Sequence, residues 1–319
     1  MIFTQNFGVT SKVFTGQPHI SYLRFGKAKT PLGYTIGDTT ALDVSKRTAI
    51  LKSYSEYLER VGMGMPIGEK NIRDCICWNG NLLKIQYSEF GYGNGVWGVN
   101  DTTGTASGVN TSRILEKAIL ELIEKNDSLC FWFSDCGNEI IINDHLQKYI
   151  KQQNFIADKY RLYMVNEISN YYTCIFFAFK DGRLVSTGVS CTNKLIVAAK
   201  NAIAEAKIIE WQQYNNPYSN YSSLTEEECK KIINRINTKK YIANIEHYQE
   251  KTSMVAFPDW VGKIAFAIIN TDSHGIKTVK CVSESLLSCM PIKKNIEAAL
   301  EKTVVKKYYK EKDLDCPIS

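Results

Sequence analysis

The segment Ser53-Tyr54-Ser55-Glu56-Tyr57-Leu58-Glu59-Arg60 places two carboxylates three residues apart and follows them with a cation. The segment Glu121-Leu122-Ile123-Glu124-Lys125 repeats this arrangement. Positions i and i+3 of a helix share one face, so each segment presents two adjacent carboxylates. Magnesium takes oxygen ligands and commonly bridges a few carboxylates to phosphates. Either pair alone would fit an ordinary solvated helix face, but the recurrence favours a metal-binding site.

Both segments belong to a loose internal repeat, in which a turn rich in Gly, Thr and Ser leads into an alanine-containing helix. The predicted helices span residues 44–61, 112–133 and 195–214, and the turns before them are 37–42, 101–108 and 188–192. The third helix carries Glu205, with Asn201 one turn earlier. We expect the three helices to converge on one acidic cleft.

The remaining pattern predicts an α/β protein with mixed sheets flanked by long helices. Residues 172–179 and the strand after Asp181-Gly182 read as a hairpin with Asp-Gly in its turn. Further helices are predicted at 144–153, 226–236 and 293–312, and strands near 261–269 and 277–282. No linker or low-complexity stretch divides the chain, so a single domain over residues 1–319 is expected.

Composition and charge exclude several classes of protein. Hydrophobic residues make up 44% of the chain and charged residues 23%, as in ordinary globular proteins. The net charge is 39 − 33 = +6, and no basic run is interleaved with aromatics, which argues against nucleic-acid binding. No signal peptide or membrane-length apolar run is present. The ten cysteines include no Cys-x-x-Cys pair, so we expect reduced thiols in a soluble, cytoplasmic protein.

Other catalytic motifs are weaker. The glycine-rich residues 91–98 match neither a Walker loop nor a dinucleotide fingerprint. No family signature surrounds any cysteine, and buried cysteines usually act as small hydrophobic residues. Asp272-Ser273-His274 reads as a turn, because a catalytic triad is recognised by its geometry and not by adjacency in sequence.

The three turn–helix units, in this order, resemble the YcaO family. Glu56-Tyr57-Leu58-Glu59-Arg60 resembles its first helix motif, and residues 106–125, from Ala-Ser-Gly to Glu-Leu-Ile-Glu-Lys, resemble its second. Residues 198–205 resemble the third. The resemblance covers residues 35–215 by motif, while residues 216–319 are expected to complete the same fold.

The resemblance implies a component of ribosomal-peptide modification that uses ATP and magnesium. Such enzymes phosphorylate a backbone amide oxygen, which leads to an azoline (cyclodehydration) or a thioamide. Phosphoryl transfer depends mostly on positioning and charge neutralisation, which clustered carboxylates and metals supply. The implied metal ligands are Glu56, Glu59, Glu121, Glu124 and Glu205. The implied nucleotide-binding residues are Arg60, Lys125, Arg113, Lys117 and Asn201.

Several positions depart from the family pattern. The family has Ser where this chain has Lys52, and Glu and Gln where it has Arg113 and Lys117. It also has arginine at the positions of Lys125 and Asn201. A carboxylate replaced by arginine puts a cation where a cation ligand stood.

Two interpretations of these departures stay open. Arg113 and Lys117 would contact phosphates directly in an active heterocyclase, with fixed charge in place of a metal. Alternatively, the nucleotide site has degenerated, and the protein is a non-catalytic YcaO-like subunit that binds a precursor peptide or an active partner. The segment before residue 35 is short for a leader-recognition domain, so we expect a separate leader-binding or catalytic partner protein. A homodimer is also compatible with the sequence.

Overall fold

The computed structural model describes residues 4–7, 18–35, 37–64, 72–215, 221, 223–242, 245, 248–251, 254–310 and 314–318. The chain forms two compact units. Within the described residues, the first unit consists of 4–7, 19–126 and 259–307. The second consists of residue 18, residues between 127 and 258, and 308–318. Each unit has its own sheets and its own hydrophobic core.

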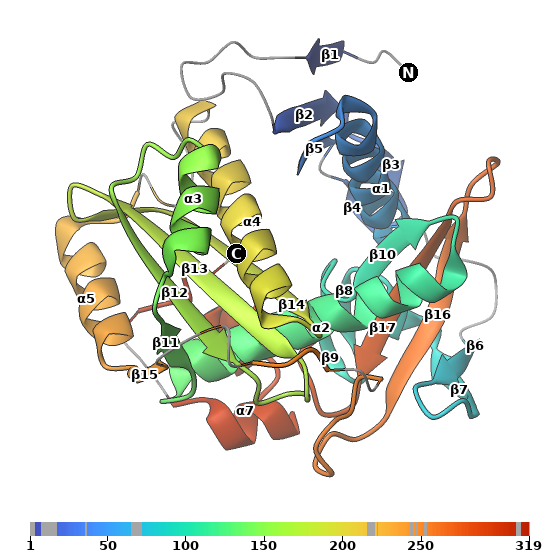
Figure 1. Cartoon of the computed structure of the whole chain (residues 1–319). Coiled ribbons are helices and arrows are strands. Elements are labelled where there is room, and N and C mark those ends of the chain that lie inside the picture. The colour runs from blue at the N-terminus through green and yellow to red at the C-terminus, as the bar shows by residue number, and fades with distance from the viewer. Residues whose placement is uncertain are drawn as a thin grey trace. The chain divides into compact units, whose positions relative to one another are not determined.

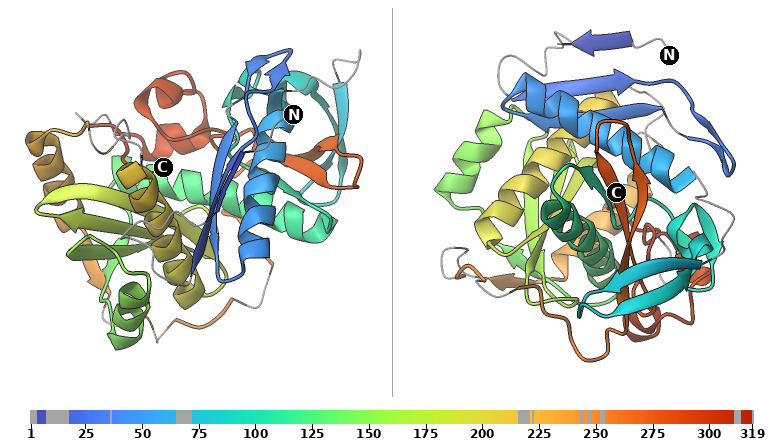
Figure 2. Two further views of the ribbon diagram at one scale, coloured as in Figure 1. Left: turned by 90° about the horizontal axis from the view of Figure 1, so that it is seen from above. Right: turned by 90° about the vertical axis from the view of Figure 1, so that its right-hand side faces the viewer.

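A small antiparallel sheet in the first unit supports helix α1 (Lys46–Gly64). It has the order β1 (Thr4–Phe7), β2 (His19–Arg24) and β5 (Asp38–Asp43). Figure 2 shows α1 lying along β2 and β5. Tyr57 and Leu58 of α1 pack against Leu23 and Phe25, and the rings of Phe25 and Tyr57 stack with centroids 4.2 Å apart. This packing fixes the face on which Glu56 and Glu59 project.

A five-stranded antiparallel sheet completes the first unit (Figure 1). Its order is β10 (Thr105–Gly108), β17 (Lys277–Ser283), β16 (Ile264–Thr271), β6 (Ile72–Cys77) and β7 (Leu82–Gln86). Short elements add the pairs β3 (Lys29–Thr30) with β4 (Gly33–Tyr34) and β8 (Gly93–Gly95) with β9 (Gly98–Asn100), and the 3-10 helix η1 (Tyr87–Phe90). Met63, Phe90 and Ile269 belong to the core beside this sheet.

The prediction of a single charged helix over residues 293–312 is wrong. The segment forms two short helices, α6 (Lys293–Glu297) and α7 (Thr303–Tyr308). Between them Lys302 is buried and donates to the Ser283 carbonyl, while Val304 N donates to the Ser285 carbonyl at 3.0 Å. These contacts with residues distant in sequence override the local helical pattern.

The second unit is a five-stranded sheet with helices on both faces. Its order is β14 (Arg183–Thr192), β13 (Tyr172–Lys180), β12 (Lys159–Val165), β11 (Asn138–Ile140) and β15 (Lys240–Ile242). The predicted hairpin is confirmed as β13 and β14. Helices α3 (Asp144–Gln152) and α4 (Leu195–Asn215) pack through Leu146, Ala202 and other apolar residues onto one face. Helix α5 (Glu226–Asn237) contacts β14.

Helix α2 (Thr111–Phe133) ends in the second unit, and a buried ammonium holds its end in place. Lys239 Nζ donates to the carbonyls of Phe131, Ser134 and Cys136 at 2.8, 3.0 and 2.9 Å. The last carbonyls of a helix lack intrahelical partners and carry partial negative charge. Lys239 therefore satisfies carbonyls that water does not reach.

Replacing Lys239 with methionine is expected to lower the free energy of unfolding by about 2 kcal/mol, because buried acceptors lose a charged donor. Chemical denaturation followed by circular dichroism measures the loss. Lys240→Met is the matched control, since Lys240 is the adjacent lysine and is exposed. Equal stability of the two variants would show that the ammonium does not stabilise the helix end.

Two further observations concern the whole described chain. No helix among the described residues is long and apolar enough to cross a bilayer. All ten cysteines are free thiols, and nine of them are buried.

Candidate functional site

Glu59 is the centre of a charged cluster in the first unit. Helix α1 supplies Glu59 and the C-terminal end of strand β10 supplies Ser107. Glu59 Oε1 accepts hydrogen bonds from Ser107 N at 2.9 Å and from Lys117 Nζ at 3.1 Å. The Glu59 side chain is only 8% exposed. Its carboxylate therefore joins α1 to β10 and to the first half of α2.

Lys117 supplies the positive charge closest to this carboxylate. Glu59 and Glu121 both raise the pKa of Lys117, with Glu59 the larger cause, so the lysine is charged throughout the physiological range. Its side chain is 60% exposed, and an ion pair at this exposure contributes about 1 kcal/mol or less to stability. The ion pair therefore adds little to stability, and its main effect is to place the positive charge of Lys117 beside the Glu59 carboxylate.

Arg60 neutralises the other carboxylate on α1. Its Nη2 atom lies 2.5 Å from Glu56 Oε1, one helical turn earlier, and its Nη1 atom donates to the carbonyl of Asp38 at the start of β5. Burial raises the pKa of Glu56 while Arg60 opposes that rise. Arg60 thus orients Glu56 through a direct contact with the carboxylate.

Glu121, the third carboxyl group of the cluster after Glu56 and Glu59, has a strongly raised pKa. Burial, followed by repulsion from Glu59, raises the pKa of Glu121 to about 8 despite the cations Lys117, Lys125 and Lys280. At neutral pH this carboxyl group is mostly neutral.

The free energy of unfolding should fall as the pH rises from 4.5 to about 8, because Glu121 keeps a proton in the folded protein that the unfolded chain has released. The expected slope is on the order of 1 kcal/mol per pH unit. Glu121→Gln should remove this part of the slope, as measured by urea denaturation across the pH range. The control is Glu116→Gln, at an exposed position of α2. A slope unchanged in Glu121→Gln would contradict the protonated state.

Lys280, Ser107 and Tyr92 join the cluster without having been identified from the sequence. Lys280 is fully buried and donates to the carbonyls of Asp101 at 2.7 Å and of Thr103. Burial raises the pKa of Tyr92 to about 12, and this residue interacts electrostatically with Arg60 and Glu59. The Ala106-Ser107-Gly108 turn was part of a motif, but the role of its Ser107 N–H in holding Glu59 follows only from the fold.

The other predicted site residues lie in different surroundings. Lys125 is buried and Glu124 half-buried on α2, and Arg113 is exposed near the start of that helix. Lys52 Nζ lies 2.7 Å from Asp43. Glu205 and Asn201 are on α4, in the second unit, where Glu205 Oε2 accepts from Val189 N at 2.8 Å. The structure thus brings together Glu56, Glu59, Glu121, Arg60 and Lys117.

The residues of this cluster do not fit a magnesium site. Among the residues that the structure describes, no three Asp, Glu, His or Cys side chains form a metal-binding group. The Lys117 ammonium already pairs with the Glu59 carboxylate, and the Arg60 guanidinium already pairs with the Glu56 carboxylate. Magnesium requires several oxygen ligands with little competing positive charge. The cluster instead balances its own charge with side-chain cations.

Comparison with solved structures identifies the fold. The structure of YcaO from Methanopyrus kandleri bound with AMPPCP and Mg2+ matches with a TM-score of 0.71 and 11% identity, over 90% of this chain and 86% of that one. A chain of the E. coli microcin synthetase McbBCD complex with pro-MccB17 bound matches with a TM-score of 0.71 and 12% identity, over 99% and 96%.

A third structure, a heterocyclase in complex with substrate and cofactor, has a TM-score of 0.62 and 10% identity, over 90% of this chain and 49% of that one. No family model and no curated protein matches the sequence. At these identities the comparisons show the fold alone, and they confirm the predicted α/β, YcaO-like architecture. The chain has a YcaO-like fold.

Proposed function

We propose that the protein is a non-catalytic YcaO-like subunit of a peptide-modifying system, which binds a precursor peptide or an active partner. The observation that carries this proposal is the contact between Lys117 Nζ and Glu59 Oε1 at 3.1 Å. In a magnesium site this carboxylate would face a metal. Here a lysine on α2 meets it instead.

Charge in the cluster supports the same conclusion. Arg60 contacts Glu56 and Lys117 contacts Glu59, while Lys117, Lys125 and Lys280 all act electrostatically on Glu121. A triphosphate brought into such a cluster would have no divalent ion to neutralise the charge that develops during phosphoryl transfer. Electrostatic stabilisation of that charge supplies most of the catalysis in phosphoryl-transfer enzymes.

A second candidate is an active, ATP-dependent heterocyclase in which fixed cations contact the phosphates. The exposure of two residues favours it: Lys117 is 60% exposed despite its contact with Glu59, and Arg113 is exposed near the start of the same helix. Both side chains can therefore reach an anion from solvent. This alternative requires nucleotide binding in the unmodified protein.

Restoring the family residues tests the proposal. The triple variant Arg113→Glu, Lys117→Gln, Asn201→Arg should gain magnesium-dependent binding of AMPPCP by calorimetry, because it removes two cations and supplies a carboxylate on α2. A control variant, Lys148→Gln with Lys230→Glu, changes exposed lysines of α3 and α5 and should gain nothing. Nucleotide binding by the unmodified protein that the triple substitution weakens would favour the heterocyclase alternative.

A further inference from the structure

Strands β11 and β12 pair at one end and then separate. Their register is Asn138 opposite Met164 and Glu139 opposite Tyr163, and pairing between the two strands stops there. Ile140, the last residue of β11, pairs on its other side with Ile242 of β15. β12 stays paired with β13 along its whole length, from Lys159 to Val165. One edge of β12, at residues 159–162, is therefore left without a neighbouring strand in the described part of the chain.

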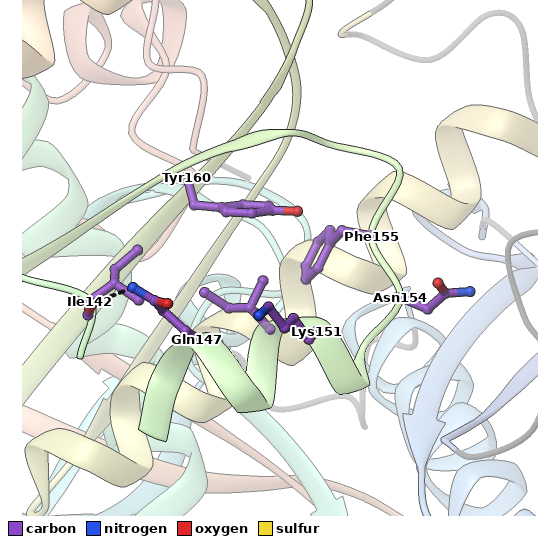
Figure 3. A pocket seen from close by; sticks show the side chains of 7 residues that line it. Ile142, Gln147, Lys151, Asn154, Phe155 and Tyr160 are labelled. Carbon is purple, nitrogen blue, oxygen red and sulfur yellow. Dashed lines mark hydrogen bonds between the residues drawn. The ribbon is translucent and has the colours of Figure 1, made fainter. Parts of the chain in front are cut away.

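A cavity of about 230 Å³ occupies the opening between the two strands. Residues 139–142 line one side of it and residues 160–162 line the other. A second cavity, of about 470 Å³, lies between α3 and the sheet, and its lining includes Ile142, Gln147, Phe155 and Tyr160 (Figure 3). A third, of about 310 Å³, lies between β12 and α5. Tyr160 lines all three, so we call them together the β12 groove.

Tyr160 forms a fixed apolar wall in this groove. Its hydroxyl group donates to the Ala157 carbonyl at 2.5 Å, and its ring stacks on Phe176 with centroids 5.7 Å apart. The ring of Phe155 meets it edge-on at the same centroid distance. Figure 3 shows Tyr160 and Phe155 on one side of the cavity of about 470 Å³, and Gln147 and Lys151 of α3 on the other. A preformed, mostly apolar cavity with a few polar groups is typical of a binding site.

The charges of the groove are mainly positive. Its lining contains the cations Lys151, Lys159 and Arg161 and the single anion Glu139. Glu139 is bound to Arg161 at 3.0 Å. Within the described residues, Lys151 and Lys159 take part in no ion pair. Two exposed positive charges thus flank an open strand edge and an apolar cavity.

We propose that the β12 groove binds an acidic peptide in extended conformation, which adds a strand to the open edge of β12. Main-chain groups of an open edge pair readily with an added strand, and pockets beside the edge select its side chains. An apolar side chain of the peptide enters the cavity of about 470 Å³ beside Lys151. The carboxylates at alternate positions point to the opposite face, where Lys159 lines the cavity beside α5. The groove shares no residue with the charged cluster around Glu59, so the test of this site is separate from the test of the proposed function.

The test uses a fluorescein-labelled heptapeptide of sequence EVEFEVE, with KVKFKVK as the charge control, and measures anisotropy on the full chain. EVEFEVE should bind, and KVKFKVK should not. The charge-reversal variant Lys151→Glu with Lys159→Glu should bind EVEFEVE at least about tenfold more weakly. Its matched control, Lys148→Glu with Lys230→Glu, reverses two exposed lysines that do not line the groove and should bind normally.

Hydrogen exchange locates the peptide. Bound EVEFEVE should slow exchange of the amides of residues 159–162, and a peptide N-methylated at alternate residues should neither bind nor protect them, since it cannot pair with a strand. No binding of EVEFEVE, or binding that the charge reversal leaves unchanged, would overturn the proposal. Protection of residues 159–162 that rises with protein concentration in the absence of peptide would also overturn it, because the occupant would then be a second copy of the chain.

Discussion

Replacing Glu210 with leucine is expected to lower the free energy of unfolding by about 3–5 kcal/mol, the usual cost of removing one partner from a buried ion pair. Glu210 Oε2 lies 2.6 Å from Lys207 Nζ, and both side chains are fully buried. The other carboxylate oxygen accepts from the N–H groups of Ile156 and Ala157 at 3.0 Å each. Lys207 also donates to the Asn154 carbonyl at 2.7 Å.

The stability lost in Glu210→Leu should come from the Lys207 ammonium, which is left buried without its partner. A double variant separates this cause from a loss of packing. Burial lowers the pKa of Lys207, so an unpaired ammonium at this position would be costly to keep charged. Lys207→Met with Glu210→Leu should recover part of the stability lost in the single variant. Guanidinium denaturation followed by circular dichroism gives both values. A double variant less stable than Glu210→Leu would contradict this account of the pair.

Gly188→Ala is expected to lower the free energy of unfolding by about 3 kcal/mol or more. Strand β14 passes so close to α4 that an added Cβ atom would lie 2.1 Å from the Ala202 carbonyl oxygen and 2.5 Å from Ala206 N. Both neighbours are backbone atoms and cannot move without shifting the helix. The same contact holds α4 where Glu205 accepts from Val189 N.

The control for Gly188→Ala is Gly182→Asn, in the hairpin turn between β13 and β14. Gly182 has a φ of +76°, which asparagine tolerates, and nothing lies within 4 Å of an added Cβ. We expect Gly182→Asn to lower the free energy of unfolding by about 1 kcal/mol or less, and thermal unfolding of both variants measures the difference. Equal losses would show that the backbone contact between β14 and α4 has little energetic importance.

Local pattern accounts for the long helices and the hairpin. The helices expected at 112–133 and 195–214 are found at Thr111–Phe133 and Leu195–Asn215. Their apolar positions repeat at helical spacing, and Asp181-Gly182 provides the turn chemistry for β13 and β14. The segment 293–312 has comparable periodicity but breaks into α6 and α7, because buried contacts of Lys302 and Val304 with residues 283 and 285 outweigh it.

The candidate site was predictable only where it follows from spacing along one helix. Glu56, Glu59 and Arg60 share a face of α1, so their spacing in the sequence predicts that they lie close together. The contact of Ser107 N with Glu59 joins residues 48 positions apart, and Lys280 enters from a different strand. Periodicity carries no information about such contacts, and they determine which charge each carboxylate meets.

Calorimetric titration of the unmodified protein with AMPPCP, in the presence and absence of magnesium, tests most directly whether the cluster around Glu59 has lost its metal-dependent nucleotide site. The contacts of Lys117 with Glu59 and of Arg60 with Glu56 predict no magnesium-dependent heat of binding, even at millimolar nucleotide. Micromolar binding that requires magnesium and disappears in a Glu56→Gln variant would contradict the proposal and identify a working nucleotide site.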